Sequence, residues 1–86
     1  MERTIILGVK LHDRIHTSEQ FQKIISEHGC IIKTRIGLHH VENGVCSPSG
    51  VILLELLGSD EDINNLENSL KTIPNIEIQK MVFETR

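Results

Sequence analysis

The stretch VILLELL, residues 51–57, decides the fold. Every position in it is apolar except Glu55. A nearly continuous apolar run of this length is typical of a strand that is buried on both faces. A second run of this kind, TIILGVKL, occupies residues 4–11 and ends at polar residues. We therefore expect residues 4–11 and 51–57 to be the two central strands of a sheet.

Two further segments alternate between apolar and polar residues, which is typical of half-exposed strands. They are CIIKTRIGLHHV (30–41) and IEIQKMVF (76–83). In the first, the alternation places four side chains on one face, Ile32, Thr34, Ile36 and Leu38. It puts Ile31, Lys33, Arg35 and Gly37 on the opposite, exposed face. We expect both segments to be edge strands.

Helical periodicity separates these strands. One helix is expected from Thr17, which forms a capping-box pattern with Gln20; its stripe is Phe21, Ile24, Ile25 and His28, and Gly29 is expected to be a left-handed C-terminal cap. The other is expected to be capped by Ser59 or Asp60 and stopped by Pro74; its stripe is Ile63, Leu66, Leu70 and Ile73.

The resulting order is β-α-β-β-α-β. It predicts an α+β, ferredoxin-like fold over residues 1–86 as a single domain: an antiparallel four-stranded sheet with two helices on one face. The other face then carries Val51, Leu53 and Leu57, which an 86-residue monomer has little left to cover. We expect a homo-oligomer, a dimer or a tetramer. The alternative is that the loop 39–50 folds back over this face.

Composition narrows the function classes. The net charge is −3, and the aromatic residues are two Phe with no Trp or Tyr, so we expect no direct nucleic-acid binding. The apolar run near the N-terminus is too short for a signal h-region or a membrane span, which predicts a cytoplasmic protein without membrane contact. In that compartment Cys30 and Cys46 are expected to be free thiols.

The segment GLHHVENGVCSPSG, residues 37–50, carries the candidate ligands. His39 or His40 with Cys46, completed by His28 or His12 across a subunit interface, would supply the N and S donors that suit Ni or Zn. The alternative is structural: the two histidines end a solvated strand, His28 is half-buried on the helix stripe, and Cys46 packs as a small hydrophobe.

The same loop has a second interpretation. Ser47 and Ser49 stand among turn residues whose backbone N–H groups can cradle an anion or a small effector, and Arg35 can pair with an anionic ligand. An ordinary connecting loop, and edge-strand charges that block aggregation, explain these residues equally well. Catalysis by Cys46 with His39 or His40 as base is the least favoured class, because the sequence suggests no orienting group or oxyanion site. We do not expect an enzyme.

The segments RIGLHHVENGVCSPSGVILLELLG (35–58), NIEIQKMVF (75–83) and ILGVKLHDR (6–14) resemble the ACT-like regulatory domains. The closest resemblance is to the C-terminal domain of the nickel-responsive repressors and to the stand-alone regulators of the iron-only hydrogenase system. It implies a homo-oligomeric sensor or regulatory module that binds a small effector or a transition metal at a subunit interface. The alternative is a purely structural oligomerisation domain.

In the nickel repressors the ligands follow the pattern His-x-His-x5-Cys, with a further histidine from another subunit. Here His40 and Cys46 match the second half of that pattern, and His28 stands about where the cross-subunit histidine is expected. Leu38 occupies the position of the first motif histidine, and His39 is adjacent to it. The repressors' ribbon-helix-helix segment has no counterpart in these residues, so DNA binding is not carried over.

Overall fold

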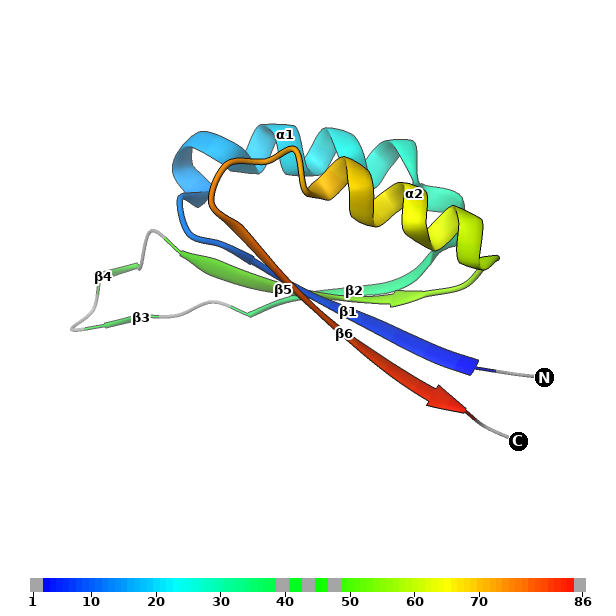
Figure 1. The fold of residues 1–86 in the computed structure, drawn as a ribbon. Coiled ribbons are helices and arrows are strands. Elements are labelled where there is room, and N and C mark those ends of the chain that lie inside the picture. Colours follow the sequence, from blue (N-terminus) through cyan, green and yellow to red (C-terminus); the bar gives the residue numbers. More distant parts are fainter. Residues whose placement is uncertain (1–2, 39–40, 43–44, 47–48, 85–86) are drawn as a thin grey trace.

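The structure is a computed structural model that describes residues 3–38, 41–42, 45–46 and 49–84. The elements are β1 (Arg3–Leu11), α1 (Arg14–Glu27), a 3-10 helix (Gly29–Ile31), β2 (Ile32–Leu38), β3 (Val41–Glu42), β4 (Val45–Cys46), β5 (Gly50–Leu56), α2 (Asp60–Leu70) and β6 (Ile76–Glu84). The predicted β-α-β-β-α-β order is confirmed, and the short hairpin of β3 and β4 is inserted between the second and third strands of the main sheet (Figure 1).

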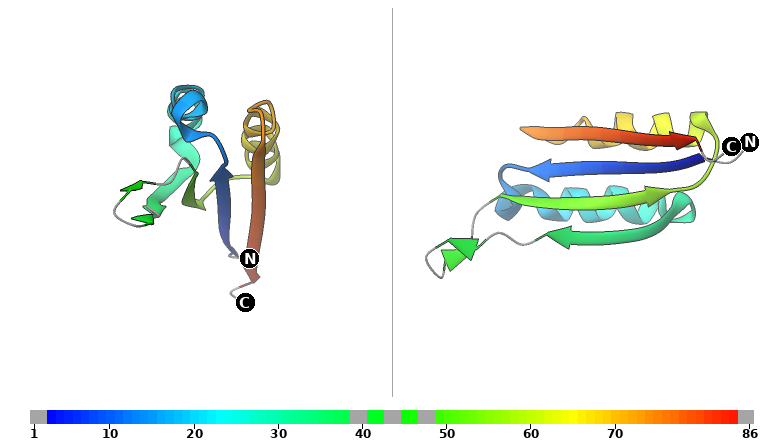
Figure 2. Two further views of the ribbon diagram at one scale, coloured as in Figure 1. Left: turned by 90° about the vertical axis from the view of Figure 1, so that its left-hand side faces the viewer. Right: turned by 90° about the horizontal axis from the view of Figure 1, so that it is seen from below.

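The main sheet has the strand order β2-β5-β1-β6, and each pair is antiparallel. The two continuous apolar runs are therefore the central strands β5 and β1, and the two alternating segments are the edges, as predicted. Helices α1 and α2 lie side by side on one face of the sheet, and the other face has no helix over it (Figure 1, Figure 2). The fold is ferredoxin-like.

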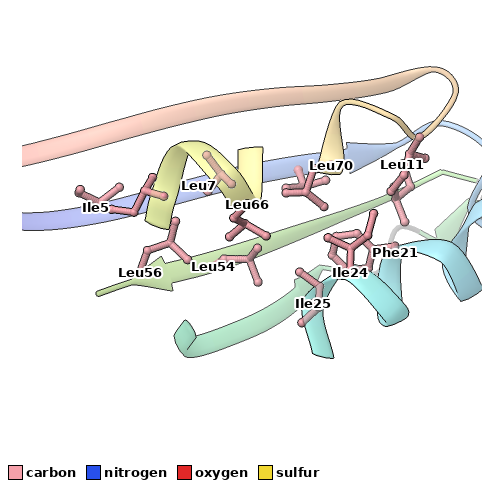
Figure 3. Close-up of a cluster of buried hydrophobic side chains, with 13 residues drawn as sticks. Ile5, Leu7, Leu11, Phe21, Ile24, Ile25, Leu54, Leu56, Leu66 and Leu70 are labelled. Carbon is pink, nitrogen blue, oxygen red and sulfur yellow. The ribbon is translucent and has the colours of Figure 1, made fainter. Parts of the chain in front are cut away.

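The core lies between the helices and the sheet (Figure 3). Every second residue of β1 faces it, and β5 adds Leu54 and Leu56. The buried apolar residues are Ile5, Leu7, Val9, Leu11, Phe21, Ile24, Ile25, Leu54, Leu56, Ile63, Leu66, Leu70 and Ile73. Both predicted helix stripes contribute, except that His28 is only half-buried at the end of α1.

Helix α1 begins earlier than predicted, at Arg14 rather than Thr17, with Asp13 as its N-cap. Thr17 is buried, and its hydroxyl donates to the Asp13 carbonyl at 2.7 Å. Gln20 does not complete a capping box, because its amide donates to the Thr72 hydroxyl instead. The helix ends with His28 as C-cap, and Gly29 starts the 3-10 turn, so the expected left-handed glycine cap is wrong.

Helix α2 is capped as predicted, by Ser59. The Ser59 hydroxyl accepts from the Asp62 N–H, and the Asp62 carboxylate accepts from the Ser59 N–H. The helix ends at Leu70, before Pro74. Its first turn is tied to β1 because Arg3 donates to Asp60 at 2.6 Å, and this hydrogen bond and charge raise the pKa of the Arg3 guanidinium.

Strand β2 departs from the predicted alternation through a β-bulge. Its register with β5 shifts between Ile32 and Thr34, so Ile32 packs on the helix-covered core while Thr34 pairs with Glu55 on the open face. The parity of every later residue follows from this shift. Arg35 therefore lies on the helix side, where it donates to the Gln22 side chain of α1 at 3.0 Å. Its predicted place on the exposed face is wrong.

The short strands β3 and β4 lie beyond the end of the main sheet (Figure 1, Figure 2). They pair with each other and form a separate two-stranded sheet. The described strands of this loop therefore do not cover the open face, contrary to the alternative considered for residues 39–50. Neither α1 nor α2 is long and apolar enough to cross a membrane.

Candidate functional site

A pocket of about 260 Å³ lies between α1 and the strands β2 and β5. Its lining includes Leu38 and Gly50, the residues that flank the hairpin segment. The β3–β4 hairpin projects from this end of the main sheet (Figure 1). The lining of the pocket is Leu11, Arg14, Ser18, Phe21, Gln22, Gly37, Leu38, Gly50, Val51 and Ile52. Residues of β1, α1, β2 and β5 thus meet around one hollow.

Two glycines explain why the hollow is not filled. Gly37 pairs with Ile52 on the helix-facing side of β2, and a Cβ placed on it would meet no atom within 4 Å. The missing side chain leaves a gap between the edge strand and α1. At Gly50, a Cβ would lie 3.3 Å from Cδ of Arg14, so the Arg14 side chain passes directly over the backbone at the start of β5.

The pocket has a polar wall and an apolar floor. Arg14, Ser18 and Gln22 recur at intervals of four residues, which places them along one side of α1. Gln22 is held by the hydrogen bond from Arg35.

The floor opposite this wall is formed by side chains of the core or next to it, Leu11, Phe21 and Ile52. An apolar pocket with a few convergent polar groups is the usual form of a small-molecule site.

Of the predicted ligands of the loop, Ser49 lies next to the pocket, Cys46 lies in the hairpin, and the others lie outside the described residues. His39, His40 and Ser47 lie outside the described residues. The backbone of Cys46 pairs with Val41 in the hairpin. Ser49 directly precedes Gly50 of the lining and is half-buried.

His28 lies at the opposite end of the main sheet. It caps the C-terminus of α1 and lines a shallow recess with Cys30 and Asp62 near the start of α2. The hairpin follows the other end of β2, about 20 Å away at the usual rise per residue. A single chain therefore does not bring His28 to Cys46.

His12 lies at the hairpin end of the sheet, where its Nε2 is 3.2 Å from a Glu77 carboxylate oxygen. It is exposed in the turn that follows β1. Within the described ranges, no three His, Cys, Asp or Glu side chains gather as a metal site would require. A metal site built on His28 would need a second chain.

The sequence contains two signals for this pocket that the predicted boundaries conceal. The spacing of Arg14, Ser18 and Gln22 is one, and it is hidden when the helix is expected to begin at Thr17. Gly37 is the other: strict alternation puts it on the exposed face, whereas the bulge at residues 32–34 places it toward α1. The start of α1 at Arg14 and the bulge at residues 32–34 are seen in the structure, and the sequence pattern does not reveal them.

Comparisons with known proteins establish the fold. No protein-family model and no curated protein matches the chain. Among solved structures, the uncharacterized protein TM1266 from Thermotoga maritima superimposes with a TM-score of 0.80 at 20% identity, over 96% of this chain and 100% of that one.

Two further structures are similar at lower scores. CPII, a nitrogen regulatory PII-like protein from Thiomonas intermedia K12, has a TM-score of 0.59 at 10% identity, over 99% and 97% of the two chains. CutA1 from Oryza sativa has a TM-score of 0.58 at 12% identity, over 98% and 83%. The shared feature is the ferredoxin-like fold of small PII-like and CutA1-like proteins.

Proposed function

We propose that the chain is a small homo-oligomeric regulatory module of the ACT-like kind, which acts in the cytoplasm by binding a small effector rather than by catalysis. One observation carries this proposal. Strands β2 and β5 line the pocket on one face of the sheet, and on the other face β2 carries exposed apolar side chains beside half-buried ones of β5.

The open face has the character of a subunit interface. Four of its side chains are about half exposed, Ile36 (51%), Leu38 (49%), Met81 (47%) and Phe83 (52%). Leu38 and Ile36 pair with Val51 and Leu53 of β5, whereas Met81 and Phe83 pair with Ile6 and Thr4 of β1. Contiguous apolar surface of this kind usually marks an interaction site, and a second copy of the chain offers the same surface.

Alternation along β2 couples the two faces. Gly37 lines the pocket and pairs with Ile52, while its neighbour Ile36 pairs with Leu53 on the open face. A ligand that moves β2 relative to α1 therefore moves the side chains of the proposed interface as well. If the ligand binds one arrangement better than the other, it shifts the population between them.

Two of the structural comparisons support a regulatory role. CPII is described as a nitrogen regulatory protein and was solved with ADP, AMP and bicarbonate bound. A protein of Thermus thermophilus with a TM-score of 0.57 is described as a PII-like signaling protein. These descriptions concern those proteins, and they favour a small-molecule sensor over a structural module for this chain.

The effector in the nickel-repressor version of this proposal is Ni or Zn. His39, His40 and Cys46 of one chain would hold it with His28 of a second chain, because His28 lies at the far end of its own sheet. Nitrogen and sulfur donors of this kind bind either metal. Metal binding then requires the oligomer.

Native mass spectrometry of the full chain, before and after addition of Ni or Zn, tests both parts. We expect an oligomer in every case, and in the metal version one ion per site that the triple variant His39→Ala, His40→Ala, Cys46→Ala loses while it stays assembled. An oligomer without metal would contradict the metal version and leave effector binding. A monomer at micromolar concentration would contradict the proposal as a whole.

A further inference from the structure

We propose that the pocket between α1, β2 and β5 binds a short aliphatic monocarboxylate, with the carboxylate at Arg14 and Ser18 and the hydrocarbon chain toward Phe21 and Ile52. This inference rests on the proposed function and names the chemical class of its effector. It concerns a pocket within one chain and needs none of the histidine or cysteine residues of the loop.

The charge of the lining selects an anion. Among the described residues that line the pocket, Arg14 carries the single charge, and no acidic side chain takes part. Arg14 is also the first residue of α1, where the helix dipole adds positive potential. Its guanidinium is suited to a planar carboxylate, and the Ser18 hydroxyl one turn further can donate to the same group.

The apolar floor of the pocket favours a hydrocarbon chain as the uncharged part of the ligand. Leu11 and Phe21 are buried in the apolar core behind the pocket, and the half-buried Ile52 packs against this core and offers the accessible apolar surface. A polar molecule placed there would lose hydrogen bonds to water without replacement, whereas a hydrocarbon chain is stabilised by leaving water. An anion that is polar throughout, such as phosphate, does not match this floor.

The size of the pocket bounds the ligand. Sites for drug-sized ligands are usually about 300–1,000 Å³, so a pocket of about 260 Å³ fits a molecule on the order of ten non-hydrogen atoms. A nucleotide is too large. Hexanoate has a suitable length and charge, and it serves as the probe.

The first test is a titration of the full-length chain with hexanoate, followed by two-dimensional amide NMR. We expect saturable shifts centred on Ser18, Gly37 and Gly50, and binding at least tenfold weaker for hexanol, which has the same chain without the charge. Equal binding of hexanol, shifts confined to the open face, or no shifts up to millimolar hexanoate would each overturn the inference.

Two charge-removing substitutions on α1 test whether Arg14 binds the carboxylate. Arg14→Gln should weaken hexanoate binding at least tenfold and leave hexanol binding unchanged. Lys23→Gln removes the same charge from α1 at a residue that does not line the pocket, and it should bind hexanoate as the unmodified chain does. If the two variants behave alike, Arg14 does not hold the carboxylate and the assignment is wrong.

Two substitutions at Gly37 that add side-chain volume test where hexanoate binds. Gly37→Val should abolish hexanoate binding because the new side chain enters the pocket; Gly37→Ala, which adds one carbon, should weaken it. A Cβ added at Gly29 would also meet no atom within 4 Å, yet Gly29 lies at the other end of the sheet, so Gly29→Val should bind normally. Full binding by a folded Gly37→Val chain would overturn the inference.

These outcomes are separable from those of the proposed function. An oligomer that does not bind hexanoate overturns the carboxylate site and leaves the regulatory module in place. A monomer that binds hexanoate in this pocket does the reverse.

Discussion

At the residue scale, Gly58 is the one described glycine with a positive φ. Its φ of 122° is in a region that side chains rarely adopt, and a Cβ there would lie 3.0 Å from Cγ2 of Ile31. It forms the turn between β5 and α2, next to the cap of that helix. Strain and crowding therefore act together at one residue.

We predict that Gly58→Ala lowers the free energy of unfolding by about 1–3 kcal/mol. Urea denaturation followed by circular dichroism measures it. Gly29→Ala is the matched control, because a Cβ at Gly29 meets nothing within 4 Å and its φ is not positive. Equal stability of the two variants would show that the turn does not need a glycine.

Residue patterns alone do not locate both helix caps. The sequence has a capping-box pattern at Thr17 and a capping residue at Ser59, and only Ser59 caps a helix. Thr17 is a whole turn inside α1, because Asp13 and Arg14 already begin the helix and the core buries the threonine. A local motif does not reveal that the preceding residues are helical.

At the element scale, α2 depends on its cap. The reciprocal hydrogen bonds of Ser59 and Asp62 satisfy backbone and side-chain groups at the N-terminus, and three acidic residues follow in the first turn. We predict that Ser59→Ala lowers the free energy of unfolding by about 1 kcal/mol.

The same urea denaturation tests this prediction. Ser26→Ala, in the last turn of α1, removes an exposed hydroxyl from a helix interior and should change the stability by less than about 0.5 kcal/mol. A Ser59→Ala chain as stable as Ser26→Ala would contradict the capping role.

Strand β2 shows why the site is less predictable than the fold. Its alternation predicts one unbroken strand, and the bulge at residues 32–34 exchanges the faces of the residues that follow relative to Ile32. This one-residue shift turns Arg35 and Gly37 toward α1, so that Gly37 lines the pocket and Arg35 donates to Gln22 of the pocket wall. Alternation of apolar and polar residues with a period of two does not predict such a shift.

At the scale of the whole molecule, the arrangement of the strands is predictable. Only central strands need apolar residues on both faces, and residues 4–11 and 51–57 are the two runs that satisfy this requirement. The same logic predicts an open face that carries Val51 and Leu53, which are half-buried in the structure. The exposed apolar side chains of this face are Ile36, Leu38, Met81 and Phe83, and the bulge in β2, not the predicted alternation, places Ile36 and Leu38 there.

The measurement that most directly tests the account is the mass of the chain in solution, by light scattering after size exclusion. We predict that the unmodified chain is a dimer or a tetramer, that Ile36→Lys on the open face is a monomer, and that Ile15→Lys assembles normally. Ile15 is a matched control because it is apolar and 72% exposed on α1, away from the open face. An unmodified chain that is monomeric, or an Ile36→Lys chain that assembles as before, would contradict the claim that this face joins subunits.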